Sequence, residues 1–74
     1  PLVKVLRAIN AAIGDPDFEI GISYFLRPDM RAEIRDIWEY EIEPYLEEYF
    51  RDRPGDVEAW RWAKLAEGDL RELA

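Results

Sequence analysis

The residues best suited to chemistry in this sequence are carboxylates gathered in one short stretch: Glu39, Glu41, Glu43, Glu47 and Glu48. Glutamates on facing helices can hold a pair of metal ions, but such sites also use Glu-x-x-His motifs, and the chain has no histidine. Paired carboxylates could also act as acid and base if a cleft raised the pKa of one of them. A chain of 74 residues leaves little room for such a cleft. We therefore expect a solvated acidic face, with Arg35 pairing with Glu39 one turn on.

Cysteine is absent as well as histidine. Together these absences exclude Cys/His zinc sites, thiol nucleophiles, Ser-His-Asp triads and imidazole acid–base chemistry. We therefore expect no metal site and no catalytic residue in the chain, and the composition disfavours a small enzyme.

The segment IGISYF, residues 20–25, is a second candidate site. Gly21 allows a backbone or a ligand to approach closely. Ser23 can donate a hydrogen bond to a phosphate, and Tyr24 carries a hydroxyl at the end of an apolar ring. A Gly-x-Ser triplet is a weak signal, so a tight connector with Ser23 as a helix cap remains the alternative.

Two tryptophans form a third candidate. Trp60 and Trp62 are two positions apart on an expected helix, which separates them by about 200° of rotation. Both therefore cannot face one core, and we expect one of them to be partly exposed. They are candidates for an interface with another chain, and a tryptophan lying under a neighbouring loop is an equally good explanation.

The elements that must position these residues are helical. Apolar residues recur at three- and four-residue steps from Leu2 to Ile13, and Gly14 is suited to end that helix. Apolar and polar residues alternate over 18–26, which predicts an extended, half-buried connector because no partner strand is visible. The fold class is therefore all-α, a small array of three to four helices with an extended connector after the first. The predicted helices of this single domain are about 2–13, 29–43, 44–51 and 56–67. Asn10 is expected on the solvent-facing side of the first helix, Tyr45 and Tyr49 in the core, and Asp56 as the cap of the last helix.

Pro44 divides the longest apolar stripe of the sequence. Proline lacks an N–H and clashes with the carbonyl four residues before it, which predicts a kink or a restarted helix. The stripe keeps its phase across Pro44, so we expect a kink or tight restart rather than a long loop.

The charge balance limits the partners. The chain carries 17 acidic and 10 basic residues, a net charge of −7, and residues 28–53 alone carry nine and four. Such a surface repels nucleic acid, which disfavours direct nucleic-acid binding. No apolar run is long enough to cross a bilayer, and no signal peptide is visible. One hypothesis is therefore a stand-alone acidic helical module that binds a basic partner.

Three segments of the sequence are similar to a known family. IGISYFL at 20–26 resembles an "IGHSYFM" signature, and IWEYEIEPYLEEYF at 37–50 resembles "IWEYEIxPLLEEYF". LRAINAAI at 6–13 is similar to "LxxLNxxI". In this order the segments resemble the C-terminal helical lid of AAA+ proteins related to McrB, the GTPase subunit of a 5-methylcytosine-specific restriction endonuclease.

The resemblance implies a part of a larger cytoplasmic nucleoside triphosphatase of a restriction or anti-phage system. The chain begins without methionine, as expected for such a part. An upstream AAA+ α/β subdomain would bind ATP or GTP with magnesium, and this fragment alone would bind no cofactor. The working form would be a homo-oligomeric ring, with a nuclease subunit as a further partner. No G-x-x-x-x-G-K-[ST] motif occurs here, so catalysis would lie elsewhere.

The resemblance also implies that residues of the connector face the nucleotide, namely Gly21, Ser23, Tyr24 and Arg27. Two positions depart from the family pattern. Ile22 replaces the histidine of the signature, and Phe25 occupies the place where many AAA+ lids have an arginine. Arg27 is the nearest basic substitute. Trp60 and Trp62 lie outside the similar segments.

Overall fold

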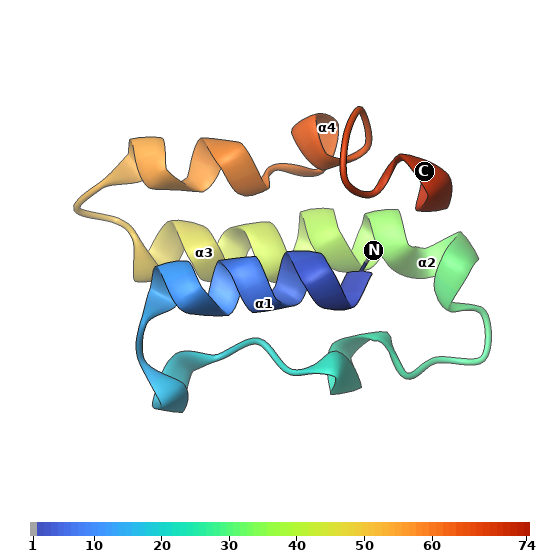
Figure 1. The fold of residues 1–74 in the computed structure, drawn as a ribbon, viewed down its shortest axis with the longest axis horizontal. Coiled ribbons are helices and arrows are strands. Elements are labelled where there is room, and N and C mark those ends of the chain that lie inside the picture. Colours follow the sequence, from blue (N-terminus) through green and yellow to red (C-terminus); the bar gives the residue numbers. More distant parts are fainter. Residues whose placement is uncertain (1) are drawn as a thin grey trace.

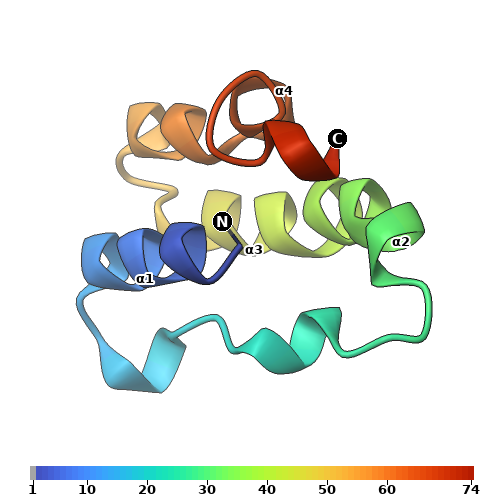
Figure 2. The ribbon, with the colours of Figure 1, turned by 45° about the vertical axis from the view of Figure 1, so that its right-hand side comes forward.

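The computed structural model of the protein describes residues 2–74 and is all-α, as predicted. Its helices are α1 (Leu2–Ile13), α2 (Met30–Ile37), α3 (Glu43–Tyr49) and the short α4 (Trp62–Leu65). Helix α1 lies beside the long helical run that contains α2 and α3 (Figure 1). The connector after α1 passes along one side of these helices and the C-terminal segment along the other, as both views show (Figure 2).

Helix α1 has the predicted bounds. Its buried side chains include Val5, Leu6 and Ile9, which share one face. It ends at Gly14, whose φ of 69° lies in the left-handed region that glycine adopts without strain. The Gly14 N–H donates to the Asn10 carbonyl at 2.9 Å and closes the last turn.

The connector contains less extended chain than the alternation indicates. Residues 19–21 are extended, but Ile22–Phe25 forms a 3-10 turn. The alternating pattern is therefore wrong at Ile22, which is 45% exposed, while Phe25 is buried. The connector is also held to α1 by a contact that periodicity does not reveal. Asn10, expected on the wet side of α1, donates through Nδ2 to the Ile20 carbonyl at 3.0 Å and accepts from the Ile20 N–H at 2.7 Å.

The helical run from Met30 to Tyr49 continues through the position of Pro44. Residues Trp38–Ile42 form a π-helical turn, in which the Glu43 N–H donates to the Trp38 carbonyl five residues back. Pro44 has no N–H to donate, and in a regular α-helix its ring would press on the Tyr40 carbonyl. The wider π turn relieves that clash. The predicted boundary between helices 29–43 and 44–51 is therefore a distortion inside one helical run.

The predicted phase of the apolar stripe across Pro44 is confirmed. Ile34, Ile37 and Trp38 before it and Leu46 after it are all at most 1% exposed. Together with α1 and the C-terminal segment they form one hydrophobic core. Within residues 2–74 no buried side-chain nitrogen or oxygen lacks a hydrogen-bond partner.

The single helix predicted at 56–67 is wrong. The structure has a 3-10 helix at Pro54–Trp60, an extended residue at Arg61 (φ −69°, ψ 142°) and then α4. The helix begins at Pro54, so Asp56 is not its cap and instead pairs with Arg53 at 3.4 Å. The break at Arg61 is fixed from outside, because the Trp60 carbonyl accepts from Trp38 Nε1 at 2.6 Å.

Candidate functional site

The connector carries the residues expected to face a nucleotide. Gly21, Ser23 and Arg27 are exposed, and Tyr24 is partly buried against the core. The turn that holds them is anchored by Phe25, which is 3% exposed and lies with its ring centroid 6.0 Å from that of Trp38. The four candidates therefore lie on one short segment, which Phe25 anchors to the core.

Nothing in the fold of residues 2–74 requires a glycine at position 21 or a serine at position 23. Gly21 has φ −86°, which any residue adopts, and an added Cβ would lie 3.6 Å from Ser23 Oγ, an ordinary contact. The Ser23 side chain makes no hydrogen bond within residues 2–74, and the turn at Ile22 has no side-chain cap. The capping alternative for Ser23 thus finds no hydrogen bond to support it.

Arg27 is engaged by two carboxylates. Its Nη2 lies 2.8 Å from Glu41 Oε2, and its Nη1 lies 3.5 Å from Glu33 Oε1. All three side chains are 37–45% exposed. Exposed ion pairs each stabilise a fold by about 0–1 kcal/mol, so little free energy opposes the release of Arg27 to another anion.

The glutamate cluster is a set of ion pairs. The predicted pair of Arg35 with Glu39 is confirmed, with Nε 3.2 Å from Oε1. Glu41 pairs with Arg27. The other three glutamates pair with Arg61 or Arg51. Across residues 2–74 no group of three or more acidic, histidine or cysteine side chains is arranged to hold a metal ion.

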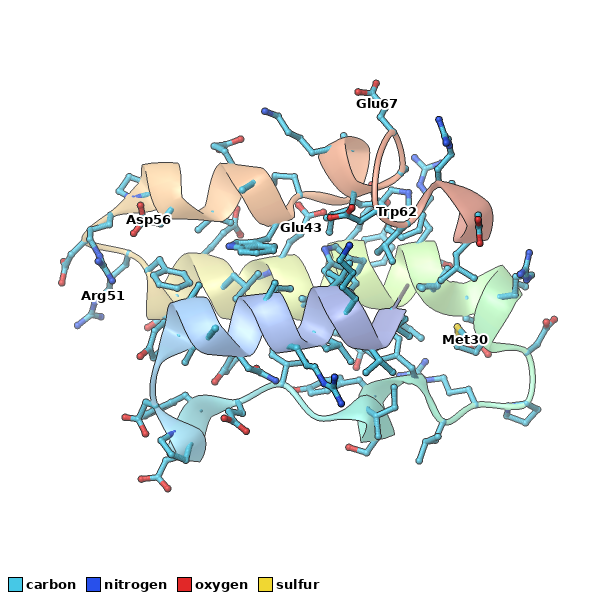
Figure 3. The ribbon with its side chains drawn as sticks, in the orientation of Figure 1. Met30, Glu43, Arg51, Asp56, Trp62 and Glu67 are labelled. Atoms are coloured by element: carbon cyan, nitrogen blue, oxygen red, sulfur yellow. The ribbon has the colours of Figure 1, made fainter. Side chains whose placement is uncertain are left out.

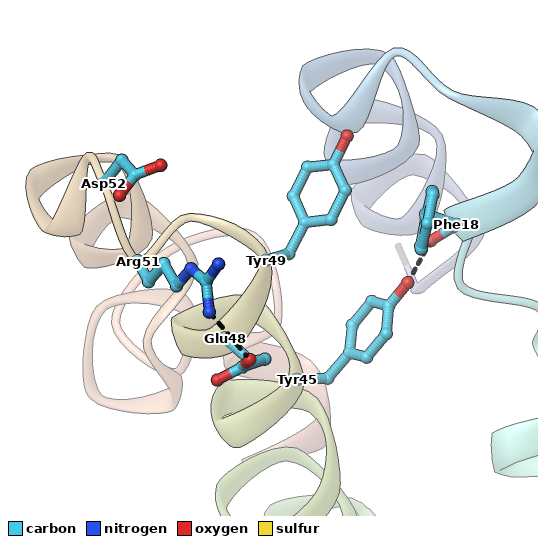
Figure 4. Close-up of a pocket in the computed structure, with 6 residues that line it drawn as sticks. All are labelled: Phe18, Tyr45, Glu48, Tyr49, Arg51 and Asp52. Atoms are coloured by element: carbon cyan, nitrogen blue, oxygen red, sulfur yellow. Dashed lines mark hydrogen bonds and ion pairs between the residues drawn. The ribbon is translucent and has the colours of Figure 1, made fainter.

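A hollow of about 390 Å³ lies at the C-terminal end of α3 and was not predicted from the sequence (Figure 4). Its lining residues are Phe18, Tyr45, Glu48, Tyr49, Arg51 and Asp52. The hydroxyl of Tyr45 donates to the Phe18 carbonyl at 2.7 Å, and that of Tyr49 donates to the Ile13 carbonyl at 3.0 Å. The four-residue spacing of the two tyrosines was the available signal, but by itself it predicts only that they share one face of a helix in the core.

Tyr45 makes stability depend on pH. Burial first, and then the nearby Tyr24, Tyr49 and Asp15, raise the pKa of its phenol above the ordinary value of 10.0. Folding therefore favours the protonated phenol, so this stabilisation is complete below about pH 10 and is lost as the pH rises through the higher pKa of the folded state.

We expect the free energy of unfolding, measured by urea titration, to fall above about pH 10 and to fall less in Tyr45→Phe. Tyr40→Phe is the control, because Tyr40 is 76% exposed. An equally steep fall in Tyr45→Phe would contradict this assignment.

A comparison with protein-family models matches residues 1–58 to the McrB alpha-helical lid domain. The chain belongs to this family. The resemblance seen in the sequence is thereby confirmed, and the lid is one part of a larger McrB-like AAA+ protein. A search of curated proteins found no match, and a search of solved structures found none either. No helix in residues 2–74 of the lid is both long and apolar enough to span a membrane.

The C-terminal part of the lid, residues 59–74, lies beyond the family match and contains both tryptophan candidates. Trp62 is 5% exposed and belongs to the core, whereas Trp60 is only partly buried. The break at Arg61 explains why both can pack inward, which an unbroken helix would prevent. Of the two interface candidates, only Trp60 remains partly exposed to solvent.

Glu43 fastens this C-terminal part of the lid to α3 (Figure 3). Its Oε2 accepts from the Trp62 N–H at 2.9 Å, and its Oε1 lies 3.1 Å from Arg61 Nη1. The same guanidinium nitrogen lies 2.8 Å from Glu47 Oε2. The hydrogen bonds that Arg61 donates to Glu47 and Glu43 raise the pKa of its guanidinium above the ordinary value, so the arginine is a permanently charged link.

Proposed function

We propose that this lid covers ATP or GTP, with its magnesium ion, bound to the α/β part of the AAA+ protein. Its nucleotide-facing edge is the connector with Gly21, Ser23, Tyr24 and Arg27. Membership of the McrB lid family supports the proposal. The observation that carries it is that Gly21 and Ser23 are exposed side by side and that nothing in the chain's own fold explains their types.

In this proposal the lid positions the nucleotide and does not itself make or break bonds. Its sequence has no phosphate-binding G-x-x-x-x-G-K-[ST] loop, so the groups that act on the phosphates belong to the rest of the protein. Its helices share one hydrophobic core, which suits a lid that moves as one body and acts as a lever between subunits of a homo-oligomeric ring. We propose further that this activity serves DNA restriction or another anti-phage system, with a nuclease subunit as a further partner, and membership of the McrB lid family supports this.

Arg27 changes partners in this proposal. Without nucleotide it is held by Glu41 and Glu33. A phosphate oxygen within reach replaces these exposed carboxylates, because a charge-assisted bond to phosphate in a closed site is stronger than an exposed ion pair.

Gly21→Ala in the full-length protein tests the proposal. The added methyl fits the isolated lid, so its thermal stability should stay unchanged. If a nucleotide or the α/β part lies against Gly21, the methyl displaces it, and kcat/KM for ATP or GTP should fall by about tenfold or more. Gly55→Ala is the matched control, because a Cβ there meets no atom within 4 Å.

The double variant Ser23→Ala with Tyr24→Phe provides a second readout, since it removes both hydroxyls of the proposed edge. It should also lower nucleotide turnover while leaving the circular dichroism of the lid unchanged. Unchanged kcat and KM in both variants would refute the role assigned to the connector.

A further inference from the structure

The hollow beside α3 combines aromatic ring faces with carboxylates, and neither the family assignment nor the proposed nucleotide edge uses it. Tyr45 and Tyr49 project from α3 to the same side, with Phe18 of the connector next to them (Figure 4). The ring centroids of Phe18 and Tyr49 are 5.4 Å apart, with the planes tilted by 50°. Glu48 and Asp52 border the same hollow on its other side.

The rings are held in place before any ligand arrives. Both tyrosine hydroxyls donate to backbone carbonyls, at 2.7 Å for Tyr45 and 3.0 Å for Tyr49. Their hydroxyl groups are therefore already hydrogen-bonded, and it is the surface of the rings that borders the hollow. Rings fixed in advance reduce the conformational entropy lost on binding.

The charges of the hollow favour a cation. Its lining holds two carboxylates and one guanidinium, that of Arg51. Arg51 lies 3.6 Å from Glu48, and both side chains are more than 70% exposed, so this pair holds Glu48 only weakly. Asp52 has no ion-pair partner within residues 2–74. Aromatic ring faces attract cations, and the net charge of −7 attracts them from a distance.

We propose that this hollow binds an arginine side chain presented by a partner protein. A guanidinium stacks on tyrosine and phenylalanine rings and can pair with a carboxylate at the same time. The hollow is open to solvent, which favours a side chain carried on a protein surface over a small free ligand that requires enclosure. The residues that line the hollow include none of the four residues of the proposed nucleotide edge, and the test involves no nucleotide.

The test uses a blocked Gly-Arg-Gly tripeptide as the probe, titrated into the isotope-labelled 74-residue chain, whose buried residues form one hydrophobic core. Nuclear magnetic resonance should show saturating shifts confined to Phe18, Tyr45, Tyr49 and Asp52. A Gly-citrulline-Gly tripeptide has nearly the same shape without the charge, and it should produce no saturating shifts.

Phe18→Leu should weaken binding of the arginine probe about two- to fivefold, because it removes one ring face. The Phe18 carbonyl that accepts from Tyr45 is backbone, so this contact is kept. Tyr40→Leu is the matched control, an exposed ring outside the hollow. Asp52→Asn should also weaken binding of the arginine probe. Glu67→Gln should not, because Glu67 lies at a distance from Arg51 of the hollow (Figure 3).

Three results would overturn the proposal. One is the absence of shifts up to the solubility limit of the arginine probe. Another is equal binding of the citrulline probe. The third is a spread of shifts over the acidic residues of α2, with no preference for the hollow, which would indicate non-specific attraction to the charged surface.

Discussion

Trp38→Ala is expected to leave the chain unfolded at room temperature. Trp38 is 0% exposed, packs against Phe25 and donates its indole N–H to the Trp60 carbonyl. Truncating a buried tryptophan to alanine destabilises a domain by about 3–5 kcal/mol. A single core in a chain of this size supplies roughly the same amount, so almost nothing would remain.

Circular dichroism and urea unfolding measure this effect. Trp38→Phe keeps an aromatic ring but loses the hydrogen bond and part of the buried ring volume, so it should cost about 1–3 kcal/mol and keep a cooperative transition. Tyr40→Ala, at an exposed position two residues away, should change stability by less than about 0.5 kcal/mol. A Trp38→Ala chain that unfolds cooperatively with a loss below about 1 kcal/mol would contradict the central place given to this residue.

Removal of residues 59–74 is expected to have an effect of similar size, although these residues lie outside the family match. Trp62, Leu65 and Leu70 are each at most 5% exposed, and each buried side chain of this kind contributes about 1.5–3 kcal/mol. Their loss also uncovers Trp38 and leaves the Glu43 carboxylate without its partners.

The shortened chain should therefore show no cooperative melting transition in calorimetry. Removal of 71–74 alone is the control, because it keeps Leu70 and takes away the last 3-10 turn, the partly buried Leu73 and the hydrogen bond from Arg31 to the Glu72 carbonyl. A chain ending at residue 58 that melts at the temperature of the full chain would show that the C-terminal part is an addition without a structural role.

Local periodicity predicted those parts of the fold that depend on neighbours along the chain. The helix at 2–13 and the apolar stripe across Pro44 follow from residue spacing. The break at Arg61 does not, because its causes are Trp38 and Glu43, far away in the sequence. The prediction that Asn10 faces solvent is wrong for the same reason, since Asn10 can bond to Ile20 only when the connector folds back against α1.

The candidate site was predictable in its residue types but not in its contacts. The order of Gly21, Ser23 and Tyr24 was visible in the sequence, and the structure adds that one anchored turn holds them. The bond from Arg27 to Glu41 spans 14 positions and could not be read from periodicity. The hollow at Tyr45 was missed because the Phe18 carbonyl that fixes this ring lies 27 positions away.

The most direct test of the account is amide hydrogen exchange of the full-length AAA+ protein with and without a saturating non-hydrolysable analogue of ATP or GTP. We expect slower exchange at residues 20–27 when the analogue is bound and no change in α4, which is fixed to α3 by Glu43. Equal exchange of residues 20–27 in the two states would contradict a lid whose connector covers the nucleotide.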